Sequence, residues 1–191
     1  YYLKNTSLKP KDEGISMDYY FWTSSNNNFP LINGNLPNYW SFSNMFVANN
    51  NVYIFSGQEY VSGYLYPTTL YKKSIVDFKN GSGTWESCGL LPFSGYGLGV
   101  IVIDSYVYSI SGRTSTNTYT YNVYKKSIYD IENSGIAWET CGQFYNSSNG
   151  RSNVTPILYN DYVYIFGGQG SLGTQNTVYK KSVSDFTSGT G

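Results

Sequence analysis

The side chains of this sequence that could perform chemistry are carboxylates, lysines and two cysteines, because the chain contains no histidine. A Ser-His-Asp or Cys-His nucleophile and every histidine-containing metal site are therefore excluded. Glu86 and Glu139 each follow a tryptophan, and they occupy matching places 53 residues apart. They therefore do not form the unique pair of facing carboxylates that a glycosidase requires. We expect no enzymatic activity, no cofactor and no metal.

Other polar residues recur at matching places. The lysine pairs could attract an acidic partner, but lysines near strand edges also keep sheets soluble, and we favour that interpretation, with the lysines toward solvent. The aspartates lack the alternating carboxylates of a calcium loop, so we expect a turn capped by a side chain. We interpret the cysteines as small buried side chains rather than a disulfide. These residues are Lys72-Lys73, Lys125-Lys126, Lys180-Lys181, Asp77, Asp130, Asp185, Cys88 and Cys141.

A sequence motif that occurs three times, called the YKKS phrase below, explains this recurrence. It reads LYKKSIVDF at residues 70–78, VYKKSIYDI at 123–131 and VYKKSVSDF at 178–186. Its tyrosines, Tyr71, Tyr124 and Tyr179, are 53 and 55 residues apart. Self-similarity at a fixed period of about fifty residues indicates a repeat architecture.

Each repeat predicts four short strands. The first two are apolar and are joined by a tight turn of Asn, Asp or Ser, which favours a hairpin. The third strand carries the YKKS phrase, an Asn- and Gly-rich turn follows it, and the fourth strand opens at Trp85 or Trp138. The predicted first strands span residues 43–48, 98–103 and 154–159, and the second strands span 52–55, 106–110 and 162–166.

These features of the repeats resemble those of kelch repeats. The resemblance rests on a second strand that ends in glycine, a Tyr on the third strand and a Trp that opens the fourth. The matching residues are Gly57, Tyr71 and Trp85, then Gly112, Tyr124 and Trp138, then Gly167, Gly168 and Tyr179. Ser56 and Ser111 replace the first glycine of the family's pair. The distance from Tyr to Trp is similar to that of bacterial and phage variants. The resemblance implies an all-β fold, a kelch-like β-propeller of four-stranded antiparallel blades, whose repeated Tyr and Trp rings pack between blades.

The repeats predict the domain organisation. Residues 1–40 form a divergent segment, with a strand at 19–23, that resembles the end of an earlier blade. Residues 41–93 and 94–148 are expected to form blades, and residues 149–191 form an incomplete blade. Because a propeller needs roughly four to eight blades, we expect a fragment of a larger ring, completed by further chain or by other subunits.

The composition restricts the partners. Twelve basic and twelve acidic residues give a net charge of zero, so nothing favours nucleic acid. No apolar stretch approaches the length of about twenty residues that a membrane helix needs, so we expect no membrane insertion. The variable loops at 57–69, 92–97, 112–122, 144–153 and 168–177 are rich in Tyr, Ser, Gly and Asn, which is typical of adaptable binding surfaces.

Ten positions in these loops are our candidates for ligand contact, although loop tyrosines are also ordinary surface in a chain with 22 of them. The candidates are Gln58, Tyr60, Tyr64, Tyr66, Tyr96, Arg113, Thr118, Tyr145, Arg151 and Gln169.

The leading hypothesis is a non-enzymatic binding or adhesion module that recognises a cell-surface glycan or protein through one loop-rich face. The resemblance implies an extracellular, cell-surface or virion location, for example in a phage fibre or surface appendage, and assembly as a homo-oligomer or in a larger structure. Two alternatives stay open. One is an intracellular kelch-type scaffold for protein interactions, and the other is a carbohydrate-active propeller enzyme whose catalytic residues lie outside residues 1–191.

Overall fold

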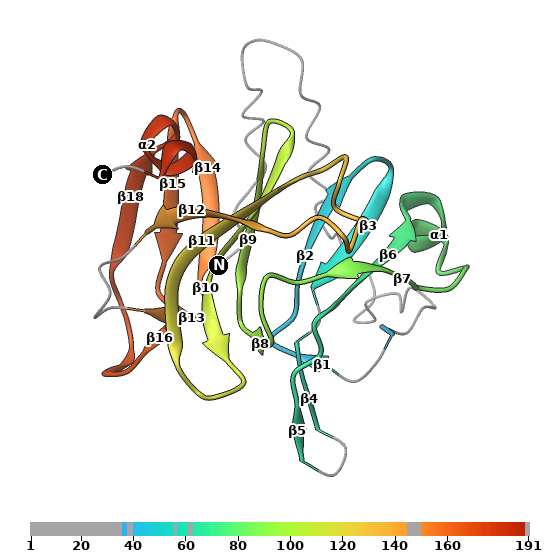
Figure 1. Ribbon diagram of the computed structural model, residues 1–191, viewed down its shortest axis with the longest axis horizontal. Coiled ribbons are helices and arrows are strands. Elements are labelled where there is room, and N and C mark those ends of the chain that lie inside the picture. Colours follow the sequence, from blue (N-terminus) through green and yellow to red (C-terminus); the bar gives the residue numbers. More distant parts are fainter. Residues whose placement is uncertain (1–35, 38–39, 56, 61–62, 145–149, 190–191) are drawn as a thin grey trace, which may run out of the picture. The chain divides into compact units, whose positions relative to one another are not determined.

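The computed structural model in Figure 1 describes residues 36–37, 40–55, 57–60, 63–144 and 150–189. All of them belong to one compact unit that spans residues 32–191. The strand predicted at residues 19–23 and most of the segment 1–40 lie outside the described residues.

Three antiparallel sheets follow one another along the chain. The first has the order β2-β3-β6-β7, the second β9-β10-β11-β12 and the third β14-β15-β18. The fold is therefore all-β with several antiparallel sheets, as predicted. The strands are β2 (Asn44–Ala48), β3 (Asn51–Phe55), β6 (Thr69–Ser74), β7 (Glu86–Leu90), β9 (Gly99–Ile103), β10 (Tyr106–Thr114), β11 (Tyr119–Ser127), β12 (Glu139–Gln143), β14 (Thr155–Tyr159), β15 (Tyr162–Phe166) and β18 (Val178–Ser182).

The hairpin that begins each sheet forms for the predicted reason. Asn49, Asp104 and Asn160 at the turns all have positive φ angles, a conformation that Asn and Asp tolerate better than most residues. The fourth strands also begin where expected, directly after Trp85 and Trp138. Alternating apolar residues then give each sheet two faces that can be buried.

The sheets pack face to face in the order of the sequence. We call the face directed at the following sheet the forward face and the opposite one the rear face. Figure 1 shows β9 lying between β2 and β14, and β9 contacts both of them. The forward face of the first sheet, with Phe55 and Leu70, packs on Val107 in the rear face of the second. The forward face of the second sheet packs in the same way on Val163 and Ile165 of the third.

Two short helices follow the YKKS strands, where only a turn was predicted. They are α1 (Ile75–Asn80) and α2 (Val183–Ser188). Ser74 caps α1 by accepting a hydrogen bond from the backbone N–H of Asp77, and Ser182 caps α2 in the same way. The Asp77 carboxylate accepts hydrogen bonds from Ser74 Oγ and Ser82 Oγ, which lower its pKa. The predicted capping by a side chain is therefore found at Asp77 and Asp185, but the capped segment is a helix and the capping residue is a serine.

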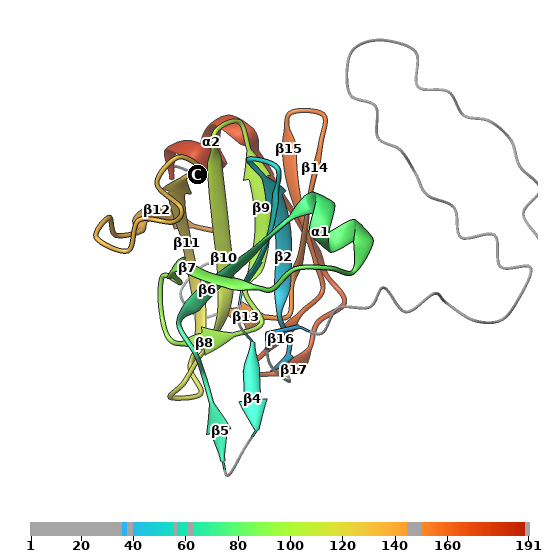
Figure 2. The same cartoon turned by 90° about the vertical axis from the view of Figure 1, so that its right-hand side faces the viewer.

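Small strands at the other end of the repeats order the loops that the sequence predicts as variable. β1 (Trp40–Ser41), β4 (Gln58–Tyr60) and β5 (Tyr64–Leu65) form one small sheet. β13 (Arg151–Ser152), β16 (Gln169–Gly170) and β17 (Gly173–Thr174) form another. In the second repeat, β8 (Gly95–Tyr96) pairs with the far end of β10. Figures 1 and 2 both show these strands at the end of the sheets opposite α1 and α2.

A backbone hydrogen bond joins each repeat to the next at the same position. The N–H of Gly97 donates to the carbonyl of Phe42 at 3.2 Å, and the N–H of Asn153 donates to the carbonyl of Gly97 at 2.7 Å. All three residues have φ angles near +60°, the left-handed region that non-glycine residues seldom adopt. The repeats are therefore linked by main-chain atoms at one fixed place.

The prediction that the lysine pairs point to solvent is wrong for Lys73 and Lys126. Their side chains are only 5% and 4% exposed. β6 and β11 are interior strands, each paired on both sides, so one lysine of each pair must lie against a neighbour. Lys73 Nζ lies over the ring of Trp85, and Lys126 Nζ donates to the carbonyl of Asn133. Burial lowers the pKa of Lys126.

Candidate functional site

Four of the residues predicted to contact a ligand form one continuous network. Gln58 Nε2 donates to the hydroxyl of Tyr66 at 3.2 Å. The Tyr66 ring stacks on that of Tyr96, with centroids 5.5 Å apart. Arg113 Nη1 then donates to the Tyr96 hydroxyl at 3.1 Å. We call these four residues together with Tyr119 the Tyr96 network.

The small strands bring these residues together from two repeats. Gln58 lies on β4, and Tyr66 follows β5 directly. Tyr96 on β8 is the antiparallel partner of Arg113 on β10, so their side chains project from one face of the pair. Tyr66 of one repeat and Tyr96 of the next therefore meet because the loops fold into small sheets.

Tyr119 completes the network. The guanidinium carbon of Arg113 lies 4.8 Å from the centroid of the Tyr119 ring, a cation–π contact. Tyr119 is the cross-strand partner of Arg113 on β11, while Thr118, the position singled out from the sequence, is exposed in the preceding turn. The alternation of Tyr119 and Tyr121 with Thr120 in the sequence is the signal that places the ring on a strand.

Some groups of the Tyr96 network are fixed by their contacts, and others are available to contact a ligand. Tyr96 is buried, whereas Tyr66 and Arg113 are partly exposed. Arg113 Nε donates to the carbonyl of Asn117 at 3.4 Å, and among the described residues Nη2 has no partner. Phe42, half-exposed, lies 5.6 Å from the Tyr96 ring. A planar cation with unused N–H groups beside aromatic rings can bind carboxylates, hydroxyls or peptide groups.

The remaining predicted residues lie in different settings. Tyr60 and Tyr64 contact each other edge to face at 5.1 Å and are exposed on the β4–β5 hairpin. Gln169 is exposed on β16. Arg151 is only 3% exposed, because Nη1 donates to the carbonyl of Gly167 and Nη2 to the hydroxyl of Tyr179. Tyr145 lies outside the described residues.

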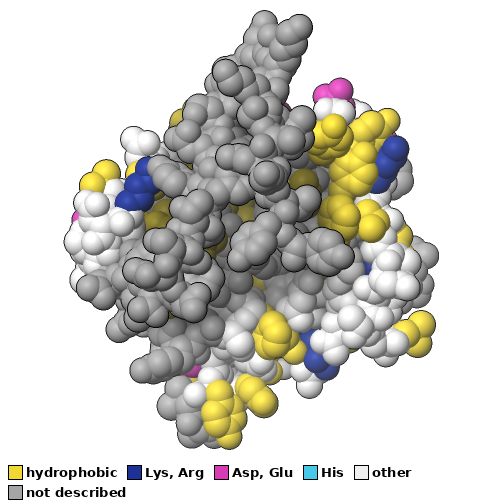
Figure 3. Space-filling model, turned by 180° about the vertical axis from the view of Figure 1, so that it is seen from behind, with side chains coloured by type: hydrophobic (Ala, Val, Ile, Leu, Met, Phe, Trp, Pro, Cys, Tyr) yellow, Lys and Arg dark blue, Asp and Glu magenta, His cyan; other side chains and the backbone are white. Residues whose placement is uncertain are grey.

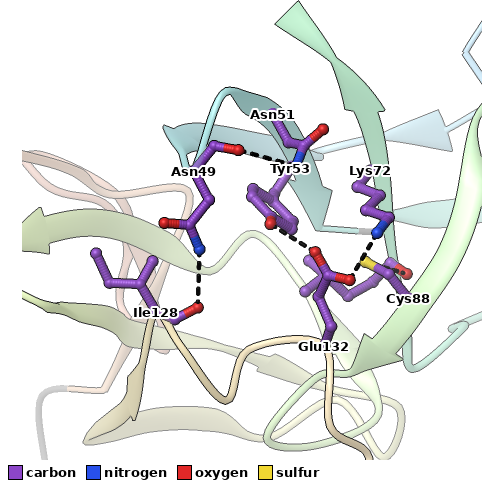
Figure 4. A network of polar contacts seen from close by, with 8 residues as sticks. Asn49, Asn51, Tyr53, Lys72, Cys88, Ile128 and Glu132 are labelled. Atoms are coloured by element: carbon purple, nitrogen blue, oxygen red, sulfur yellow. Dashed lines mark hydrogen bonds and ion pairs between the residues drawn. The ribbon is translucent and has the colours of Figure 1, made fainter.

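A second polar cluster, which the sequence did not reveal, joins the first two sheets (Figure 4). The buried Tyr53 hydroxyl donates to Glu132 Oε1 at 2.8 Å, and Lys72 Nζ donates to Glu132 Oε2 at 2.6 Å. Beside them, Asn49 Nδ2 donates to the carbonyl of Ile128 at 3.2 Å. Glu132 follows the third strand of the second repeat, so no spacing within one repeat predicts this contact.

The ionisable groups of this cluster have protonation states that suit a structural contact between the sheets and not catalysis. Burial, together with the hydrogen bond to Glu132, raises the pKa of Tyr53. Burial alone would raise the pKa of Glu132, but the hydrogen bonds from Lys72 and Tyr53 outweigh it and lower that pKa. Burial raises the pKa of the nearby Cys88 thiol to about 12. A neutral phenol, a neutral thiol and a paired carboxylate offer no activated nucleophile at neutral pH.

Both cysteines are free, as predicted. Over the described ranges, no three Cys, Asp or Glu residues are grouped to hold a metal ion. No helix within the part of the chain that the structure describes is long and apolar enough to cross a bilayer.

No protein-family model matches the sequence, and no curated protein matches it significantly.

Proposed function

We propose that this chain is a non-enzymatic binding module, built from kelch-like blades of a β-propeller, that recognises a cell-surface glycan or protein. The architectural part is supported by three successive antiparallel sheets with contacts between β2, β9 and β14. The resemblance also supports a place on a cell or virion surface, such as a phage fibre. Because folds host many functions, the function must be argued from the site.

The observation that carries the functional proposal is the Tyr96 network. It joins Gln58, Tyr66, Tyr96 and Arg113 across two repeats at one end of the sheets. The rings are held by stacking and hydrogen bonds, so little side-chain entropy is lost when they meet a ligand. Arg113 offers N–H groups for oxygen acceptors, and the exposed Tyr60 and Tyr64 add aromatic surface on the same small sheet as Gln58.

A glycan array probed with the 191-residue chain tests the proposal, with calorimetry to measure affinity for each glycan that binds. Arg113→Ala should weaken binding by about tenfold or more, because a hydrogen bond from a charged group is lost. Arg113→Lys should give an intermediate loss, since it keeps the charge but not the planar fork. Lys79→Ala is the matched control, because Lys79 is an exposed cation at the end of α1.

Two results would contradict the proposal. One is an unchanged affinity of Arg113→Ala for a bound glycan, with the variant shown to be folded by circular dichroism. The other is no binding to any glycan together with tight binding to an intracellular protein, which would favour the scaffold alternative.

A further inference from the structure

The hydroxyls of Tyr66 and Tyr96 can each donate one further hydrogen bond. Each hydroxyl oxygen already accepts a bond, in Tyr66 from Gln58 Nε2 and in Tyr96 from Arg113 Nη1. Neither hydroxyl has an acceptor for its own proton among the described residues. The Tyr96 side chain is only 6% exposed, and a buried donor without an acceptor is unfavourable. Tyr96 therefore needs an acceptor that the described part of the chain does not provide.

Arg113 adds a positive charge and further unused donors. Its hydrogen bonds use Nε and Nη1, so within the described ranges both N–H groups of Nη2 lack a partner. No described Asp or Glu forms an ion pair with Arg113, because the two salt bridges found there involve lysines. The side chain is partly buried, and its guanidinium lies over the Tyr119 ring. An unpaired charge is less favourable in such a place than in water.

Few other charges lie at this end of the sheets, which we call the loop end and which is opposite α1 and α2. Every described lysine belongs to α1 or to a YKKS phrase, near the other end of the strands. Arg151 is at the loop end but is only 3% exposed. The described carboxylate there is Glu59, which is 8% exposed and projects from the opposite face of β4 to Gln58. Arg113 is therefore the accessible cation among the described residues of the loop end.

The chemistry of these groups identifies what they can bind. An ionised carboxylate only accepts hydrogen bonds, whereas hydroxyl and amide groups also bring donors that would need acceptors of their own. A carboxylate also supplies the negative charge that Arg113 lacks, and its planar shape matches the planar guanidinium. Hydrogen bonds between such ions are roughly twice as strong as neutral ones. A site with unused donors and one cation therefore favours a ligand with a single carboxylate.

The surroundings of the site favour a sugar as the carrier of that carboxylate. The rings of Tyr66 and Tyr96 stack, and the half-exposed Phe42 lies beside them. Tyr60 and Tyr64 add exposed rings on the β4–β5 hairpin. Figure 3 shows hydrophobic side chains at the lower end of the molecule, where Figure 1 places β4 and β5. Aromatic surface beside one cation suits a sugar ring with one acid group, whereas a peptide rich in Asp or Glu requires several cations.

We propose that the Tyr96 network binds the carboxylate of an acidic sugar residue, a sialic acid or a uronic acid. Arg113 Nη1 and the Tyr96 hydroxyl oxygen lie 3.1 Å apart, so the guanidinium and the hydroxyl are close enough to donate to one carboxylate. The Tyr66 hydroxyl, on the ring that stacks against Tyr96, offers a further donor to the same sugar. This inference deepens the proposed function and rests on it.

Calorimetry with matched pairs of sugars tests the inference. The probes are the methyl glycosides of N-acetylneuraminic acid and of glucuronic acid, each compared with its carboxyl methyl ester, which keeps the sugar but loses the charge. The 191-residue chain should bind at least one of the acids about tenfold more tightly than its ester, because charge-assisted hydrogen bonds become neutral ones in the ester. The two acids distinguish a sialic acid from a uronic acid as the ligand.

Two substitutions separate the charge from the hydroxyl. Arg113→Ala should reduce the preference for acid over ester to about twofold or less, because the cation is lost. Tyr96→Phe keeps the stacked ring but removes the donor, so it should weaken binding of the acid by about threefold to tenfold. Lys79→Ala and Tyr129→Phe, at exposed residues far from the loop end, should leave both affinities unchanged. Urea unfolding checks that each variant is folded, and the matched sugars test the wild type in any case.

Several results would overturn this inference. Equal affinities for acid and ester would do so, and so would binding confined to sulfated sugars or to a Glu-rich peptide. Neutral glycans that bind through Arg113 would also overturn it, but they would leave the proposed function in place. No binding to any glycan would overturn it as well, whereas the proposed function would then still stand if the chain binds a cell-surface protein.

Discussion

The hydroxyl of Tyr53 donates a hydrogen bond of 2.8 Å to Glu132 Oε1 across the boundary between the first and second sheets. The phenol is fully buried, while Glu132 lies in the turn that follows β11 and also receives Lys72 Nζ. This contact is polar in an interface whose other contacts are mostly apolar. It therefore gives the two sheets a defined position relative to each other.

Removing the Glu132 carboxylate, which accepts the hydrogen bond from Tyr53, should lower the stability of the fold. We expect Glu132→Ala to lower the free energy of unfolding by about 1–2 kcal/mol, because the buried Tyr53 hydroxyl loses its partner. Tyr53→Phe should cost about 1 kcal/mol, and the double variant should show a coupling energy of about 1 kcal/mol. Urea unfolding of the four proteins measures these values. Additive effects would show that the hydrogen bond contributes nothing beyond the two separate side chains.

The same carboxylate should make stability depend on pH. The pKa of Glu132 is lowered from its ordinary value of 4.5, so its contribution is present above that value and is lost as the pH falls through the folded-state pKa. Between about pH 5 and pH 3 the wild type should therefore lose stability more steeply than Glu132→Gln. Because Glu132 is partly exposed, the difference should stay below about 1 kcal/mol. Asp161→Asn, at an exposed turn, should follow the wild type, and parallel curves for Glu132→Gln would contradict the assignment.

Ser109 is a buried polar residue that the fold does not satisfy. Its hydroxyl has no hydrogen-bond partner in the described structure. The equivalent residues on β3 and β15, which pair with the same tyrosine of the repeat, are Ile54 and Ile165. Ser109→Ala should raise the free energy of unfolding by about 1 kcal/mol, because an unpaired buried hydroxyl is removed. Thermal unfolding compared with Ser115→Ala, at an exposed turn, measures this. A destabilised Ser109→Ala would show that the hydroxyl does find a partner.

Cys88 should react slowly in the native protein. With its pKa raised to about 12, only about one ten-thousandth of the thiol is ionised at pH 8. Burial also raises the pKa of Cys141, whose thiol donates to the carbonyls of Phe186 and Thr187. Alkylation with iodoacetamide followed by mass spectrometry should label neither residue quickly until denaturant is added. Rapid labelling under native conditions would contradict this environment.

The hydrogen bonds that cap α1 should contribute measurably to the stability of the protein, although the helix has only six residues. Ser74→Ala removes the acceptor for the Asp77 N–H and one donor to the Asp77 carboxylate, so we expect a loss of about 1 kcal/mol. Ser87→Ala, at an exposed position on β7, should change stability by less than about 0.5 kcal/mol. Equal losses for the two variants in urea unfolding would show that the cap is not specific.

The strands could be predicted from the sequence because two strong signals coincide. Alternating apolar residues and a tight turn at Asn49, Asp104 or Asn160 specify both the hairpin and its register. The helices were missed because six residues carry little periodicity, although the recurring aspartates, Asp77 among them, already predicted a turn capped by a side chain. The buried Lys73 and Lys126 were missed because strand order, which decides the interior strands, depends on contacts distant in sequence.

The sequence predicted only part of the candidate site, because it shows the composition of the loops but not how their short strands pair. Composition alone identified Gln58, Tyr66, Tyr96 and Arg113 as loop residues with binding chemistry. It could not show that Tyr96 pairs with Arg113, or that Arg151, of the same residue type, is buried against Tyr179. Those differences arise from pairing between small strands of two or three residues, which leave almost no pattern in the sequence.

The main-chain bonds that link the repeats have a consequence for how such a chain can evolve. Phenylalanine, glycine and asparagine occupy the linking position at 42, 97 and 153, and the two bonds between them use main-chain atoms alone. At Phe42 and Asn153 another side chain changes the conformational strain by about 1 kcal/mol and leaves the bond in place. Gly97 is the exception, because a Cβ there would lie 2.9 Å from the backbone N of Asn153. Successive repeats can therefore diverge in sequence, surface and specificity while the geometry that holds them together is inherited unchanged.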